Sequence, residues 1–132
     1  MRLPPRFLLI DDDPFNNTLC KRILHKIYTK PEVITFTEPE NGLKYIQEEY
    51  SKEPLSTVIF LDINMPTLSG WEVLDKIEQF PESVKKHLTI FILSSSINFQ
   101  DKKRASENPL VTYYLEKPLT KTVLASIFTE ET

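Results

Sequence analysis

The chain is 132 residues long, 40% of them apolar and 27% charged, which is the size of one domain with its own core. Its net charge of −3 argues against bulk binding to nucleic acid or to an anionic membrane. A single cysteine, Cys20, excludes an internal disulfide and a cysteine-based zinc site, and the apolar runs are too short to span a membrane. We therefore expect a cytoplasmic protein with one domain over residues 1–132.

Five short apolar runs, rich in Val, Ile, Phe and Tyr, are predicted to be β-strands. They are Phe7–Ile10, Val33–Phe36, Val58–Leu61, Ile90–Leu93 and Val111–Leu115. At least four of them lack alternation of apolar and polar residues, which is typical of strands covered on both faces, as in a parallel sheet.

Amphipathic stretches between the strands predict five helices. The first follows Asp13 as N-cap and Pro14 as first helical residue. Its predicted buried stripe consists of Phe15, Leu19, Cys20, Ile23, Leu24 and Ile27. The other helices are predicted around Leu43–Tyr50, around Val73–Phe80, over 98–107, and after Thr120 as far as Phe128. Strands that alternate with helices predict an α/β fold with a doubly wound, five-stranded parallel sheet.

In such a sheet, ligands bind beyond the carboxyl ends of the strands, and here those ends carry acids, hydroxyls and a lysine. The residues in question are Asp11, Asp12 and Asp13, then Asp62 and Asn64, then Ser94, Ser95 and Ser96, and finally Glu116, Lys117 and Pro118. Each group taken alone has an ordinary explanation as a cap, a turn or a solvated charge. Together they predict one site, where the repulsion between neighbouring acids is best relieved by a cation.

The residue types indicate phosphoryl transfer. Asp12, Asp62 and a backbone carbonyl near Asn64 offer the hard oxygen ligands that Mg²⁺ prefers. A carboxylate beside Mg²⁺ can attack phosphorus and form an aspartyl phosphate. Lys117, the Ser94 hydroxyl and a backbone N–H would then neutralise the phosphoryl oxygens.

With these motifs the chain resembles a response-regulator receiver domain of two-component signalling, from Phe7 to about Phe128. The segments that carry the resemblance are FLLIDDDPFN, VIFLDINMPTLSGWEVL, IFILSSS and YYLEKPL. The resemblance implies a flavodoxin-like strand order of 2-1-3-4-5 and Mg²⁺ as cofactor. It also implies that Asp62 is the phosphoacceptor and that Asp11, Asp12, Asp62 and the Asn64 carbonyl bind the metal, Asp12 directly and Asp11 partly through water.

The resemblance further implies a switch. Ser94 matches the switch hydroxyl, Tyr114 the switch aromatic and Lys117 the lysine of the family. Pro118 fits a cis peptide, and the positions of Pro66 and Gly70 after Asp62 are as in receivers. Phosphorylation would draw Ser94 to the phosphate and let Tyr114 move inward, which changes the face formed by the fourth helix, fifth strand and fifth helix.

The expected partners follow from the same resemblance. A sensor histidine kinase or a histidine phosphotransfer protein would donate the phosphoryl group, and a downstream protein would bind the switching face. We expect no direct contact with nucleic acid or membrane, and a monomer or weak homodimer. If the chain is the natural one, it is a stand-alone receiver with no output domain, and no enzyme beyond self-catalysed phosphorylation and autodephosphorylation.

Three alternative functions share some of these features. An aspartate-nucleophile phosphatase would place a second acid two residues after the nucleophile, where this chain has Asn64. A flavodoxin-type electron carrier would need a phosphate-binding loop after the first strand, where three aspartates would repel a phosphate. A receiver-like interaction module that is never phosphorylated remains open until phosphorylation is assayed.

Overall fold

The strands form one parallel sheet in the order β2-β1-β3-β4-β5, in a computed structural model that describes residues 1–50, 52 and 54–129. This confirms the predicted fold class and strand order. The strands are β1 (Arg6–Ile10), β2 (Glu32–Phe36), β3 (Thr57–Leu61), β4 (Leu88–Ser94) and β5 (Val111–Glu116). Every residue of β1 and β3 is buried, as expected for central strands covered on both faces, whereas the edge strands β2 and β5 are partly exposed.

Six helices are present in the described residues, one more than predicted. They are α1 (Pro14–Ile27), α2 (Pro39–Glu49), α3 (Gly70–Glu78), α4 (Glu82–Lys85), α5 (Phe99–Glu107) and α6 (Lys121–Ile127). The additional helix is α4, a single turn that follows Pro81, which ends the preceding helical pattern. The predicted fourth and fifth helices therefore correspond to α5 and α6. None of the described helices is long and apolar enough to cross a membrane.

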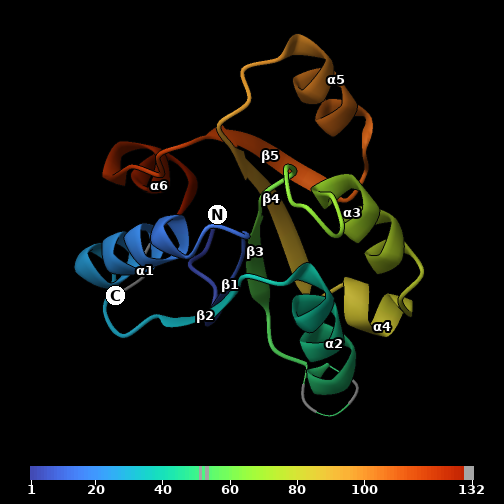
Figure 1. The fold of residues 1–132 in the computed structure, drawn as a ribbon. Helices are drawn as coiled ribbons and strands as arrows, with labels where there is room; N and C mark the ends of the chain where they lie inside the picture. The colour runs from blue at the N-terminus through green and yellow to red at the C-terminus, as the bar shows by residue number, and fades with distance from the viewer. Residues whose placement is uncertain (51, 53, 130–132) are drawn as a thin grey trace.

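The helices cover both faces of the sheet (Figure 1). Figure 1 shows α1 and α6 on one side of the strands and α2, α3 and α4 on the other. Each side has its own buried cluster: Phe7, Cys20, Leu24 and Phe128 belong to the first, and residues such as Leu74 to the second. Helices therefore cover both faces of the central strands. The polar residues that follow these strands can be reached only at the carboxyl ends of the strands.

The predicted buried stripe of α1 is wrong in part. Phe15 and Leu19 are 68% and 42% exposed, while Cys20 and Leu24 are buried. The predicted stripe includes residues from too wide an arc of the helix. The sheet covers only one side of α1, and Cys20 and Leu24 lie on that side. Asn17, which lies outside the predicted stripe, is buried instead.

The start of α3 is packed tightly against the end of β3. A Cβ added at Gly70 would lie 2.5 Å from the carbonyl oxygen of Asp62 and 2.7 Å from Cα of Ile63. The Gly70 N–H donates to the Ile63 carbonyl at 3.0 Å. Ser69 and Glu72 form a reciprocal capping box at the same helix end. Glycine at position 70 thus allows α3 to fix the backbone that carries Asp62.

Candidate functional site

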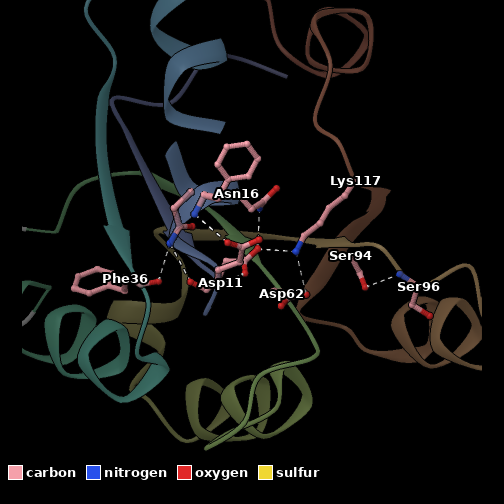
Figure 2. A network of polar contacts seen from close by, with 10 residues as sticks. Asp11, Asn16, Phe36, Asp62, Ser94, Ser96 and Lys117 are labelled. Carbon is pink, nitrogen blue, oxygen red and sulfur yellow. Dashed lines mark hydrogen bonds and ion pairs between the residues drawn. The ribbon is translucent and has the colours of Figure 1, made fainter. Parts of the chain in front are cut away.

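The acids predicted at the ends of β1 and β3 converge at the carboxyl edge of the sheet (Figure 2). One carboxylate oxygen each from Asp11, Asp12 and Asp62 lies within 4.8 Å of the other two. Figure 2 shows Asp11 and Asp62 side by side. Two backbone hydrogen bonds set this arrangement by extending the sheet one residue beyond its strands: Asp11 N–H donates to Phe36 O at 3.0 Å, and Asp62 N–H donates to Ile10 O at 2.9 Å. Asp11 and Asp62 are buried and Asp12 is exposed.

Asp11 is held by three hydrogen-bond donors. Its Oδ1 accepts from the Asp13 N–H at 2.9 Å. Its Oδ2 accepts from Asn16 Nδ2 at 2.8 Å and from Lys117 Nζ at 2.7 Å. These bonds fix the orientation of the Asp11 carboxylate and stabilise its charge in a buried position. Asp13 also caps α1, as predicted, by accepting from the Phe15 N–H.

Asn16 and Asn17 are residues of the site that the sequence analysis missed. Asn17 Nδ2 donates to the carbonyl of Asp11 at 3.0 Å and to that of Phe36 at 3.3 Å, so it ties α1 to the ends of two strands. The sequence does contain a signal. Two amides in the first turn of a helix that follows three aspartates are placed to donate back to the acidic loop.

Lys117 reaches the acids from the end of β5. Its Nζ lies 2.7 Å from Asp11 Oδ2 and 3.6 Å from Asp62 Oδ1. Figure 2 shows the Lys117 side chain extending toward both acids. Its backbone N–H donates to the Ser94 carbonyl at 2.9 Å, which joins the ends of β4 and β5. The Lys117–Pro118 peptide is cis, as expected from the resemblance.

Burial and neighbouring charges shift the pKa values of Asp62 and Lys117. Burial, followed by the negative charge of Asp11, raises the pKa of Asp62 to about 6, although Lys117 and a hydrogen bond from the Asn64 backbone oppose the shift. Burial alone lowers the pKa of Lys117, but the hydrogen bond and charge of Asp11 and the charge of Asp62 raise it above its ordinary value. Lys117 is therefore cationic, and it leaves the negative charge in the site only partly compensated.

Ser94, Ser96 and Tyr114 form a second polar group beside the acids. Ser94 is fully buried, and its Oγ accepts from the Ser96 N–H at 3.1 Å. The Tyr114 hydroxyl donates to the Ser96 carbonyl at 2.7 Å. Ser96 Oγ donates to Asp101 of α5 at 2.7 Å. Both predicted switch residues are therefore hydrogen-bonded to Ser96.

Three further predicted site residues follow β3: Asn64 and Pro66 lie on the loop to α3, and Gly70 is the first residue of α3. Asn64 and Pro66 are exposed, and Gly70 is buried against the Asp62 backbone. The structure thus brings together Asp11, Asp12, Asp62 and Lys117, with Ser94 at the end of the neighbouring strand. All ligand atoms of this cluster are hard oxygens, which fits a divalent cation of the magnesium or manganese type.

Comparison with known proteins agrees with this geometry. The family model of the response regulator receiver domain matches residues 7–129. The chain belongs to this family. The receiver domain is a part of two-component signalling proteins, so the resemblance based on the four sequence segments is confirmed.

Individual relatives support the same assignment. The response regulator Rcp1 of Synechocystis is 31% identical over 117 residues, which are 86% of this chain and 78% of Rcp1. Several other curated relatives are much longer, and this receiver domain spans well under half of each.

Solved structures agree as well. A two-component response regulator from Cytophaga hutchinsonii has a TM-score of 0.85 and 32% identity, with 95% of this chain and 94% of that chain covered. The Mn²⁺-bound form of Rcp1 has a TM-score of 0.72 and 27% identity over 94% of this chain and 88% of that chain.

Proposed function

We propose that this receiver domain is a phosphoacceptor of a two-component or phosphorelay system, with Asp62 as the phosphorylated residue. The observation that carries the proposal is the position of Asp62: buried, beside two other carboxylates, and 3.6 Å from the ammonium group of Lys117. A carboxylate that is incompletely neutralised and faces a lysine is suited to nucleophilic attack on a phosphoryl group.

Mg²⁺ is the proposed cofactor. Asp11, Asp12 and Asp62 would hold it, together with the backbone carbonyl of Asn64. The three donors already bound to Asp11 favour a water-mediated contact for that residue and a direct one for Asp12. When bound, the cation would supply positive charge against the phosphoryl oxygens. The Mn²⁺-bound form of the relative Rcp1 is in keeping with a divalent metal at this site.

The proposed donor is a phosphohistidine on a sensor histidine kinase or a histidine phosphotransfer protein. An Asp62 Oδ attacks the phosphorus, and the bond from phosphorus to the imidazole nitrogen breaks as the new P–O bond forms. The departing imidazole keeps the electron pair of the broken bond and takes up a proton. Lys117 neutralises one phosphoryl oxygen, and the Ser94 hydroxyl with a backbone N–H neutralises another.

Dephosphorylation completes the cycle. A water molecule attacks the phosphorus of the aspartyl phosphate, which releases inorganic phosphate and restores the Asp62 carboxylate. We propose that the protein carries out only these two self-catalysed reactions. Asn64, rather than an acid, stands two residues after Asp62, so the chain lacks the general acid–base that an aspartate-nucleophile phosphatase uses.

The proposed switch passes through Ser96. In the structure the Ser96 N–H donates to Ser94 Oγ and the Ser96 carbonyl accepts from Tyr114. If Ser94 Oγ moves to bind the phosphoryl group, the Ser96 N–H loses its acceptor and the loop that holds Tyr114 is released. The added charge would thus favour one of two loop arrangements.

The proposed output surface is formed by α5, β5 and α6. Three large apolar side chains are exposed on or beside these elements. Ile97, just before α5, and Phe99, at its start, are 77% and 76% exposed, and Tyr113 on β5 is 47% exposed. Exposed apolar side chains of this size, at the start of α5 and on β5, suit a protein partner that binds in only one of the two states. A downstream protein, rather than nucleic acid, is the proposed target.

Phosphorylation can be tested by intact-mass measurement. Incubation with phosphoramidate and Mg²⁺ is expected to add about 80 Da to the wild-type protein and nothing to Asp62→Asn. Asp75→Asn, which removes an exposed acid from α3, is the matched control and should be labelled like the wild type. No mass gain in the wild type, or an equal gain in Asp62→Asn, would contradict the proposal and favour an unphosphorylated interaction module.

A further inference from the structure

Positive charge is concentrated on α1 in a protein whose net charge is −3. The 14 residues of α1 include no Asp or Glu, but they include Lys21, Arg22, His25 and Lys26, all exposed. Within the part of the chain that the structure describes, none of these four side chains forms an ion pair. By contrast, Lys85, Lys102 and Lys117 each have a carboxylate partner.

These side chains line a groove on the flank of α1 that faces the edge strand β2. The groove has a volume of about 580 Å³ and includes Thr18, Lys21, Arg22, His25 and Lys26 of α1, with Thr35 of β2 opposite them. It begins at Asn17, the residue that donates to the Asp11 carbonyl, and it continues along the helix away from the acidic cluster. One wall is therefore cationic, and the other is an edge of the β-sheet as the structure describes it.

The spacing of the cationic groups fits an extended peptide. Residues four apart on a helix are separated by about 6 Å along its axis, as are the cations Arg22 and Lys26; His25, four residues after Lys21, adds a ring N–H donor. Alternate residues of an extended chain are separated by about 6.6 Å and point to the same side. Carboxylates at alternate positions of such a segment would therefore face successive basic side chains of α1.

We propose that this groove between α1 and β2 binds an extended, acidic segment of a partner protein. Charge complementarity selects the occupant, because the groove offers uncompensated cations and hydroxyl groups. A nucleic acid fits less well. Its phosphate charge is continuous and would extend past the groove to the carboxylates of Asp12 and Asp13 that precede α1, whereas a short acidic segment ends within the groove. The proposal concerns a surface other than the phosphorylation site and the α5–β5–α6 face, and it does not depend on phosphorylation.

Binding of a defined peptide tests the proposal. The probe is a fluorescein-labelled peptide of about seven residues in which glutamate alternates with serine, and fluorescence anisotropy gives its Kd. Lys21→Glu/Arg22→Glu reverses two charges in the groove. Lys44→Glu/Lys103→Glu reverses two exposed charges outside it and is the matched control. Lys21→Ala/Arg22→Ala is a milder second variant, and the amide NMR spectrum verifies that each variant is folded.

We expect the groove reversal to raise the Kd of the alternating peptide at least tenfold, the alanine pair to raise it less, and the control reversal to change it less than about twofold. A peptide of the same composition with its glutamates in one block should bind more weakly. Its carboxylates would no longer be spaced like the basic side chains of α1. Equal losses in the groove and control variants, equal binding of the two peptides, or tighter binding of a thymidine oligonucleotide would each overturn the proposal.

Discussion

Asp11 and Asp62 are both buried carboxylates at the end of a strand, and they differ in what surrounds them. Asp11 accepts from three donors, and one of them is Lys117 Nζ at 2.7 Å. The same Nζ lies farther from Asp62, at 3.6 Å. The charge of Lys117 therefore acts mainly on Asp11. Asp62 is left with a pKa of about 6, mainly because of burial and of the charge of Asp11. Of the two buried carboxylates, the one with the less compensated charge is also the proposed nucleophile.

This imbalance predicts a stability change in the metal-free protein. The pKa of Asp62 is about 6 in the folded protein and near its ordinary value of 3.8 in the unfolded chain, so the folded state binds more protons between these values. Stability should fall as the pH rises from 4 to 6, by up to about 3 kcal/mol from this group. Asp62→Asn in EDTA should therefore raise the free energy of unfolding by about 1–3 kcal/mol at pH 7.5 and change it little at pH 4.

Urea unfolding at the two pH values measures the difference. Asp75→Asn is again the matched control, because Asp75 is exposed and its removal should leave the pH dependence unchanged. If Asp62→Asn destabilised the protein at pH 7.5, Lys117 would have to compensate the charge of Asp62 fully, and Asp62 would not be the less compensated of the two buried carboxylates.

Two helices stand out among the elements. α3 leaves no room for a side chain at its first residue, and α1 faces the sheet with a different set of residues from the one predicted. α3 meets the strand end at Gly70, where backbone atoms of Asp62 and Ile63 lie within 3 Å of the position a Cβ would occupy. α1 turns Cys20 and Leu24 to the sheet and leaves Phe15 in solvent. Burial, followed by the charge of Asp11, raises the pKa of the Cys20 thiol to about 11, so this cysteine behaves as a core residue.

The two glycines of the chain offer a direct comparison. At Gly70 an added methyl group would meet backbone atoms, whereas at Gly42 in α2 its nearest contact is the end of the Ile10 side chain at 2.9 Å. We expect Gly70→Ala to cost about 2–3 kcal/mol and to slow phosphorylation, because α3 and Asp62 must shift apart. Gly42→Ala should cost less than about 1 kcal/mol, because Ile10 can adjust and alanine favours the helix. Urea titrations and phosphoramidate labelling of both variants measure this, and equal costs would contradict it.

Across the whole molecule, stability is distributed unevenly. The central strands and α3 contribute many fully buried side chains, but α5 contributes only Ala105. Its side chains also make polar contacts: Lys102 with Glu116 at 2.6 Å, Asp101 with Ser96 at 2.7 Å, and Arg104 over the Trp71 ring at 4.5 Å. Exposed ion pairs of this kind stabilise little, so we expect α5 to be displaced more easily than α3.

Hydrogen exchange should reveal this difference. We expect the amides of α5 to exchange through local opening, with protection at least tenfold lower than that of α3, whose Val73, Leu74 and Ile77 are fully buried. Native-state exchange followed by NMR measures both helices in one sample, so α3 is the internal control. Equal protection of the two helices would show that the polar contacts hold α5 as firmly as a core does, and would argue against a mobile output face.

Much of this protein could be predicted from its sequence. The buried strands β1 and β3 are continuous apolar runs, and the acids and the lysine follow such runs directly, so their convergence at one sheet edge follows from parallel topology. Asn16 was missed because its role depends on a hydrogen bond to Asp11 that only the rotation of α1 provides. The exposure of Phe15 was missed for the same reason.

The amino-acid sequence by itself determined the element order, the family and the residues at the strand ends, because these depend on local patterns along the chain. Only the tertiary structure decided which side of α1 faces the sheet, how Lys117 divides its charge between Asp11 and Asp62, and where the basic side chains of α1 border the β2 edge. Those features depend on contacts between segments far apart in sequence, and such contacts are set by packing rather than by periodicity.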